Sequence, residues 1–141
     1  MMELQIRGKS VAPISTSILL ALTGAAAAST GTTIYSDNGG YVFRYAEFFN
    51  TAAKPIRILG PCESACTLAL HYPDTCAGPQ ASFVFHAPYN TGHHHEAVTE
   101  WVMRRFSPPI RAWLSAQGGL TTRPIKLEGT ALHRLVRRCG P

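Results

Sequence analysis

A serine and a histidine each lie at the end of a β-rich run, where they could cooperate in acyl transfer. Ser64 opens a helix-like segment after the run that ends before Gly60, and His86 ends the next such run. A serine hydroxyl becomes a nucleophile when a histidine accepts its proton. Backbone N–H groups at a helix start can face an anion, and the pair Gly39-Gly40 could bring a second N–H close. These residues predict a serine nucleophile with an oxyanion hole.

Each of these residues also has a purely structural interpretation. Serine is favoured as the capping residue of a helix, so Ser64 could serve only there. His86 could be a core histidine whose ring bonds a backbone carbonyl, and Gly39-Gly40 could form a turn that needs positive φ. We favour the active-site interpretation because these residues occur together.

Alternating strands and helices would bring the two corners together. Short β-branched or aromatic runs predict strands at 32–35, 56–59 and 82–85, and apolar spacing predicts helices at 41–53, 64–70, 96–106, 110–116 and 130–138. This order is typical of βαβ units and a mostly parallel sheet, so we predict an α/β fold. The carboxyl ends of parallel strands share an edge where ligands bind, and we expect the corners to meet there.

Length and composition indicate one folded domain. The chain has 141 residues, of which 45% are hydrophobic, with 13 Lys and Arg against 8 Asp and Glu and a net charge of +5. We expect a single domain over residues 1–141. Charged residues make up 15% of the chain, below the roughly 25% of average soluble proteins, and the apolar content is ordinary. This composition excludes a wholly disordered chain.

The basic residues do not indicate a nucleic-acid surface. Their clusters are Arg104-Arg105 and, near the C-terminus, Arg134, Arg137 and Arg138. No aromatic residues are interleaved with them for stacking on bases. We interpret them as solvated faces or subunit contacts and expect no nucleic-acid partner.

Three consecutive histidines, His93, His94 and His95, resemble a metal site in composition only. Neighbouring residues of a regular element cannot all face one ion, and zinc ligands are usually separated by two or more residues. We expect a solvated loop before the helix at 96–106, and no metal.

The order of these motifs resembles the proteolytic subunit of the Clp protease, in the ClpP/crotonase superfamily. The resemblance rests on Gly39-Gly40 after a strand, a Gly-x-x-x-Ser corner that opens a helix, and a Pro-x-Ala run into a strand ending in His86. It is closest to small ClpP-like proteins with a Cys-x-Ser-Ala-Cys motif, here residues 62–66. It extends over residues 4–90 and only loosely over the tail.

This resemblance implies a serine peptidase. Ser64 would be the nucleophile, His86 the general base, and the N–H groups of Ala65 and of Gly39 or Gly40 the oxyanion donors. It also implies stacked βαβ units with C-terminal helices, a homo-oligomer, and a peptide or protein substrate. Acyl transfer of this kind needs no metal or organic cofactor. A membrane association and an ATPase partner both stay open.

One member of the family's catalytic triad has no evident counterpart. The family places an acidic residue several tens of residues after the histidine, and Glu128 is the only acidic residue after Glu100. Glu128 could orient His86, the site could be a Ser-His dyad, or it could be inactive. The alternatives to a peptidase are therefore a catalytically inactive binding or scaffold protein and, less favoured, a crotonase-like acyl-CoA enzyme.

Four cysteines allow two disulfides or four free thiols. Cys62 and Cys66 lie close together at a helix start, where we expect poor geometry for a mutual bond. We expect Cys66–Cys76 with Cys62–Cys139, and Cys62–Cys76 with Cys66–Cys139 stays open.

The N-terminal segment leaves the compartment open. Residues 1–28 match the outline of a secretory signal peptide, but Pro13 and several hydroxyl residues interrupt its apolar stretch. In the ClpP fold a strand, a glycine turn and a helix precede the glycine-pair strand, and residues 4–28 could supply them. We therefore favour a structural role for this segment. The cysteines favour export, whereas a retained segment with free thiols would suit the cytoplasm.

Overall fold

A βαβ unit opens the part of the chain that the computed structural model describes, which comprises residues 31–90 and 93–140. Strand β1 (Thr32–Ile34) leads to helix α1 (Val42–Thr51) and strand β2 (Ile56–Ile58). The two strands pair in parallel, with Thr33 opposite Arg57. Phe49 is the fully buried residue of α1, so this helix packs its apolar face against the rest of the fold.

A second parallel unit carries the serine corner. Strand β3 (Pro61–Glu63) runs into the 3₁₀ helix η1 (Ser64–His71), and strands β4 (Cys76–Ala77) and β5 (Ser82–Phe85) follow. β3 pairs in parallel with β5, and β2 pairs in parallel with β4. A parallel bridge between Asp37 and Cys62 continues the pairing beyond β1. The segment after β1 therefore lies beside the strand that ends at Ser64.

The C-terminal half closes one edge of the second sheet. It contains β6 (Tyr89–Asn90), β7 (His93–His94), α2 (Glu96–Arg105), α3 (Pro108–Ala116), β8 (Ile125–Glu128) and α4 (Gly129–Leu135). β8 is antiparallel to β5, which gives the sheet order β3-β5-β8 beside a separate β1-β2-β4 sheet. This is a mixed α/β fold with small, largely parallel sheets.

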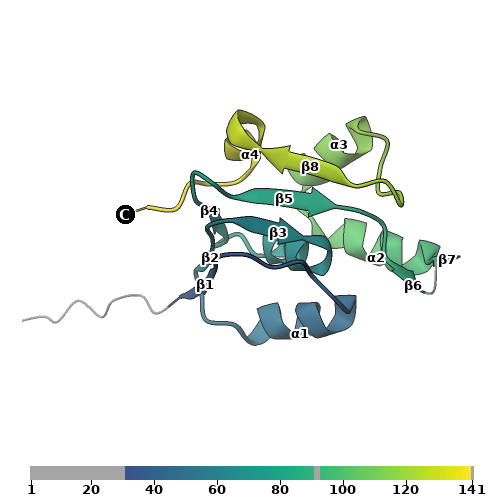
Figure 1. Ribbon diagram of the computed structural model, residues 1–141, viewed down its shortest axis with the longest axis horizontal. Coiled ribbons are helices and arrows are strands. Elements are labelled where there is room, and N and C mark those ends of the chain that lie inside the picture. Colours follow the sequence, from purple (N-terminus) through teal and green to yellow (C-terminus); the bar gives the residue numbers. More distant parts are fainter. Residues whose placement is uncertain (1–30, 91–92, 141) are drawn as a thin grey trace, which may run out of the picture.

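Helices pack on both sides of the strands, and the carboxyl ends of β3 and β5 lead into the candidate site. In Figure 1, β3 and β5 run in the same direction, with α1 on one side and α3 and α4 near β8 on the other. The β6 and β7 strands lie beyond the carboxyl ends of β3 and β5. Ser64 and His86 follow those two ends directly.

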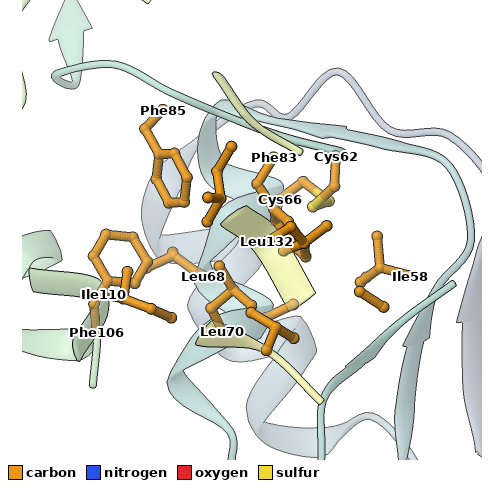
Figure 2. Close-up of a cluster of buried hydrophobic side chains, with 14 of the residues drawn as sticks. Ile58, Cys62, Cys66, Leu68, Leu70, Phe83, Phe85, Phe106, Ile110 and Leu132 are labelled. Atoms are coloured by element: carbon orange, nitrogen blue, oxygen red, sulfur yellow. A yellow bond between two sulfur atoms is a disulfide. The ribbon is translucent and has the colours of Figure 1, made fainter. Parts of the chain in front are cut away.

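The core lies between η1, β5 and the C-terminal helices. Residues 65–70 of η1 are all buried, and Phe83 and Phe85 of β5 are at most 1% exposed. Figure 2 shows Phe85 near Phe106 and Ile110 at one end of this cluster, and the Cys62–Cys66 bond near Phe83 at the other. The strand that delivers His86 is therefore anchored by close packing, as native interiors are.

The cysteines form two disulfides, but the expected pairings are wrong. Cys62 bonds Cys66 with the Cα atoms 5.3 Å apart, and Cys76 bonds Cys139 with the Cα atoms 4.8 Å apart. Both separations lie in the ordinary disulfide range. Poor geometry is expected only if both cysteines lie at a regular helix start. Cys62 instead lies in β3, and the chain turns sharply at Ser64, which brings Cys66 back toward it.

Several elements differ from the sequence-based expectations. The segment opening at Ser64 is a 3₁₀ helix, and the last helix ends at Leu135 instead of residue 138. The strands β3, β4 and β8 are absent from the prediction. Beyond Leu135 the chain becomes extended, and residues 137–139 bond Ala77 through the Ala77 N–H and carbonyl. The predicted histidine loop contains the short β6-β7 pair, with Tyr89 opposite His94.

Residues 1–28 lie outside the part of the chain that the structure describes. The interpretations of residues 1–28 as strand and helix or as signal peptide fall outside the described residues, so the extent of the domain stays a prediction. Among the described helices, none combines the length and the apolar character needed to cross a bilayer.

Candidate functional site

Ser64 occupies a sharp corner between β3 and η1. Its φ is 54°, and it is the one non-glycine residue of the described chain with positive φ. Such a conformation costs a residue with a Cβ on the order of 1–2 kcal/mol, so the surroundings must hold it. The Thr67 hydroxyl donates to the Ser64 carbonyl at 2.7 Å and closes the turn. Strain of this kind is typical of functional sites and directs the serine out of the strand.

Gly39 packs directly against this corner. A Cβ built on Gly39 would lie 2.5 Å from the Glu63 carbonyl oxygen, 2.7 Å from the Ser64 Cβ and 2.8 Å from the Ala65 nitrogen. Its φ of 77° also lies in the region that favours glycine. The structure thus brings together Gly39, Ser64 and Ala65, as the sequence predicts. Ala65 lies in the first turn of η1, where backbone N–H groups have no partner within the helix.

Two residues that the sequence reasoning did not assign to the site hold the glycine turn. The Asp37 Oδ1 accepts a hydrogen bond from the Gly39 N–H at 2.7 Å and another from the Tyr45 hydroxyl at 2.6 Å. Burial raises the pKa of Tyr45, and together with the hydrogen bond to Asp37 and the negative charge of Asp37 it brings that pKa from 10.0 to about 12. The aspartate of an Asp-Asn-Gly turn is a recognisable signal, whereas Tyr45 reads as an apolar helix position.

His86 is oriented by a backbone carbonyl. Its Nδ1 lies 3.0 Å from the Ala87 carbonyl oxygen. A carbonyl oxygen can only accept, so this contact requires the proton on Nδ1 and leaves Nε2 as an acceptor. Ala87 is fully buried, and its N–H donates to the Thr121 carbonyl at 2.7 Å, which anchors the residue whose carbonyl contacts the ring. His86 therefore has the tautomer that a general base needs.

Ser64 and His86 line one open groove. The groove has a volume of about 690 Å³, and Gly39, Gly40 and Tyr89 also line it. Ser64 and His86 also border a second, small pocket of about 20 Å³ whose walls include Phe85. That volume is close to what one water molecule needs. The groove thus brings the predicted nucleophile, base and glycine turn onto one surface.

The structure does not bring Glu128 to His86. Glu128 lies opposite Ser82, at the end of β5 remote from Phe85 and His86. A strand rises about 3.4 Å per residue, so roughly 10 Å of strand separates these two ends. The Glu128 carboxylate is 56% exposed and pairs with Lys126 at 2.7 Å. Among the described residues, the hydrogen-bond partner of the His86 ring is the Ala87 carbonyl.

The cysteines enclose the serine more tightly than we expected. The Cys62–Cys66 bond closes a ring that contains Glu63, Ser64 and Ala65, and both cysteines are fully buried. The Cys76–Cys139 bond ties the C-terminal segment to β4, away from this corner. The first bond belongs to the candidate site and the second to the scaffold.

The histidine run does not form a metal centre. His93 and His94 lie in β7 and are exposed, and the His94 ring bonds the Thr99 hydroxyl at 2.8 Å. No group of three or more metal-ligating side chains gathers within residues 31–90 and 93–140. His95 faces elsewhere and lines the groove beside His86.

Comparisons with known proteins place the fold only coarsely. No protein-family model matches the chain, and no curated protein matches it. Among solved structures, the ClpP1 N165D mutant from Listeria monocytogenes matches with a TM-score of 0.41 and 16% identity, over 77% of this chain and 74% of that one. A likeness at this level assigns no activity, so what is established is a mixed α/β fold with small parallel sheets.

Proposed function

We propose that this chain is a ClpP-like serine hydrolase that cleaves peptide or ester bonds through an acyl-enzyme. The observation that carries the proposal is the left-handed Ser64, packed against Gly39 at the corner between β3 and η1. A strained corner of this kind lifts a nucleophile out of the sheet. The groove that Ser64 shares with His86 supplies the base. In this proposal the parallel units correspond to the stacked βαβ units of the ClpP/crotonase fold, in a homo-oligomer.

Acylation would begin with attack by the Ser64 Oγ on the substrate carbonyl carbon. The His86 Nε2 accepts the hydroxyl proton as the bond to carbon forms. The carbonyl π electrons move to oxygen, and backbone N–H groups at Ala65 and the glycine turn stabilise the resulting oxyanion. The protonated His86 then gives its proton to the leaving amine or alkoxide, and the acyl-enzyme remains.

Deacylation would repeat these steps with water as the nucleophile. His86 Nε2 accepts a proton from the water, whose oxygen attacks the acyl carbon. Collapse of the second tetrahedral intermediate releases the acid, and His86 returns its proton to Ser64. Ser64 and His86 each end in their starting protonation state.

The Ala87 carbonyl orients His86 in place of the acidic residue of a catalytic triad. It fixes the Nδ1–H tautomer of His86, as an aspartate does in a triad. Losing the correct tautomer costs about 10⁴ in turnover in a serine protease. Because Ala87 keeps the tautomer, we expect a competent base. A neutral carbonyl stabilises the imidazolium less than a carboxylate, so we expect turnover slower than that of a full triad.

The residues that line the groove support a peptide as the substrate class. Tyr41 is 65% exposed, Phe43 45% and Tyr89 63%, and all three line the groove beside Ser64. Exposed aromatic side chains bind extended chains through their apolar faces. These walls suit a peptide with apolar side chains and lack the cluster of cations that a phosphate-rich acyl-CoA would call for.

The proposal is tested by hydrolysis of a panel of peptide and ester substrates by the oxidised protein. We expect turnover that falls at least 100-fold in His86→Ala, because general-base catalysis contributes about 10²–10⁴. The matched control is His93→Ala, an exposed histidine outside the groove, which should retain wild-type turnover. No turnover by the wild type, or equal turnover in His86→Ala, would contradict the proposal.

A catalytically silent binding protein is the second candidate. It is favoured by one observation, which is that no carboxylate in the described chain bonds His86. The same aromatic groove would then hold a peptide without cleaving it. Binding of a peptide that stays intact, with no turnover above background in either the wild type or Ser64→Ala, would support this second candidate.

A further inference from the structure

Asp37 joins the two halves of the candidate site through its backbone. Its N–H donates to the Pro61 carbonyl at 2.9 Å, and its carbonyl accepts from the Glu63 N–H at 2.8 Å. These bonds place it beside Cys62 in β3, just before the strand ends at Ser64. A movement of Asp37 would therefore move the serine corner and the glycine turn together.

The Asp37 side chain makes the two glycines of the turn chemically different. Its Oδ1 accepts the Gly39 N–H at 2.7 Å, so that N–H is already occupied. Within residues 31–90 and 93–140, no hydrogen bond uses the N–H of Gly40, which is exposed at the groove. An oxyanion needs donors that are free in the resting protein, and only Gly40 of the pair meets that condition.

Tyr45 holds the Asp37 carboxylate in this position. Its hydroxyl donates to the same Oδ1 at 2.6 Å. Its ring also backs the turn, because a Cβ built on Gly40 would lie 3.2 Å from the Tyr45 Cε2. Helix α1 thus reaches both glycines through one side chain.

We propose that Asp37 is the positioning residue of the oxyanion site, which occupies the Gly39 N–H and assigns the oxyanion to the N–H groups of Gly40 and Ala65. This inference rests on the proposed hydrolase function. The carboxylate acts through the glycine turn and does not touch the substrate. With Asp37 truncated, the Gly39 N–H is released and the turn loses its fixed orientation.

Two substitutions of Asp37 distinguish the effect of its charge from the effect of its hydrogen-bond acceptor. Asparagine keeps a carbonyl oxygen that can accept from Gly39 and Tyr45, but it carries no charge. Alanine removes the acceptor entirely. If position matters more than charge, the asparagine variant should behave like the wild type and the alanine variant should not.

The experiment is steady-state hydrolysis of the best substrate by wild type, Asp37→Ala, Asp37→Asn and Tyr45→Phe, with Asp74→Ala as an exposed control. We expect Asp37→Ala to lower kcat at least tenfold with KM nearly unchanged, because the oxyanion forms only in the transition state. Asp37→Asn should restore kcat to within about threefold of wild type, and Tyr45→Phe should fall between the two. Affinity for a peptide boronate, which mimics the tetrahedral intermediate, should fall in parallel with kcat.

The outcomes separate this inference from the proposed function. An active wild type with an unchanged kcat in Asp37→Ala would overturn the role of Asp37 and leave the hydrolase in place. Equal losses of kcat in Asp37→Ala and Asp37→Asn would also overturn it, since charge would then matter more than position. If Asp37→Ala does not fold, Asp37→Asn and Tyr45→Phe decide the question by the same kcat criterion. A wild type without turnover would overturn the hydrolase, and this inference with it.

Discussion

Gly39 and Ser64 lie in direct contact across the gap between two parallel units. A Cβ on Gly39 would lie 2.7 Å from the Cβ of Ser64, closer than real side chains approach. Both residues have positive φ, at 77° and 54°. The contact places the glycine turn over the start of η1, where the first N–H groups are free. The candidate oxyanion site depends on this contact between Gly39 and Ser64.

We predict that Gly39→Ala impairs both folding and the site. The new methyl group would meet the Glu63 carbonyl and the Ala65 nitrogen, which are backbone atoms that cannot easily move. The matched control is Gly119→Ala, because Gly119 has nearly the same φ, 76°, and no neighbour within 4 Å of the added Cβ. The control should lose only the left-handed penalty of about 1–2 kcal/mol. Chemical denaturation of both variants checks this, and equal losses would mean that the close approach is unimportant.

The left-handed Ser64 should itself lower the stability of the fold. We predict that Ser64→Gly is about 1 kcal/mol more stable than Ser64→Ala, because glycine adopts positive φ without a Cβ penalty while alanine retains it. Both variants lack the hydroxyl, so the comparison is independent of catalysis. Urea unfolding under oxidising conditions measures the difference. A stability of Ser64→Gly at or below that of Ser64→Ala would show that this residue is not strained.

Removal of the two disulfides should affect the stability of the fold to different extents. The Cys62–Cys66 ring spans a sequence separation of 4 and the Cys76–Cys139 bond one of 63. In the chain-entropy model, loops of these lengths give about 2 and about 4 kcal/mol of stability. We therefore predict that the Cys76→Ala/Cys139→Ala double variant loses more stability.

The reactivity of Ser64 should fall more on removal of the Cys62–Cys66 bond than on removal of the Cys76–Cys139 bond. Without the ring around it, Ser64 can relax from its left-handed conformation, and a cost of about 1.4 kcal/mol to restore it is a tenfold lower rate. We predict at least tenfold slower labelling by a fluorophosphonate in Cys62→Ala/Cys66→Ala, and nearly normal labelling in folded Cys76→Ala/Cys139→Ala. Equal labelling in the two double variants would refute a positioning role for the Cys62–Cys66 bond.

Tyr45 should make the fold sensitive to alkaline pH. Its pKa is raised from 10.0 to about 12, so the folded chain keeps the phenol proton where the unfolded chain loses it. The stability from this group is present below pH 10 and is lost as the pH rises from 10 to 12. We predict that wild type loses stability over this range more steeply than Tyr45→Phe. An equal loss of stability between pH 9 and pH 11 in wild type and Tyr45→Phe would contradict the partly buried Asp37–Tyr45 pair.

Local patterns predict the helical segments, the strands β1, β2 and β5, and the residues of the corner. The runs before Gly39 and Gly60 are β-rich, and the alternation of strand and helix implies parallel pairing. What escapes prediction depends on tertiary contacts. β8 is a short stretch with two charged residues, which becomes a strand because it pairs with β5. The last helix ends early because the chain returns to bond Ala77.

In the site, too, local motifs predict some residues, whereas tertiary contacts determine the others. Ser64, His86 and the glycine pair stand in recognisable local motifs. The Cys62–Cys66 bond was not predictable because we assumed ordinary helical geometry, which the positive φ of Ser64 breaks. Glu128 looked suitable by sequence distance alone, whereas the antiparallel register of β8 carries it away from His86. The Ala87 carbonyl is a backbone atom, and residue types give no signal for it.

The most direct measurement is the covalent reaction of the oxidised protein with a fluorophosphonate, followed by intact mass and peptide mapping. We predict a single adduct on Ser64 in the wild type, no adduct in Ser64→Ala, and an unchanged adduct in Ser115→Ala, whose serine is exposed on α3. An unreactive wild type, or an adduct that persists in Ser64→Ala, would contradict the assignment of Ser64 as the nucleophile.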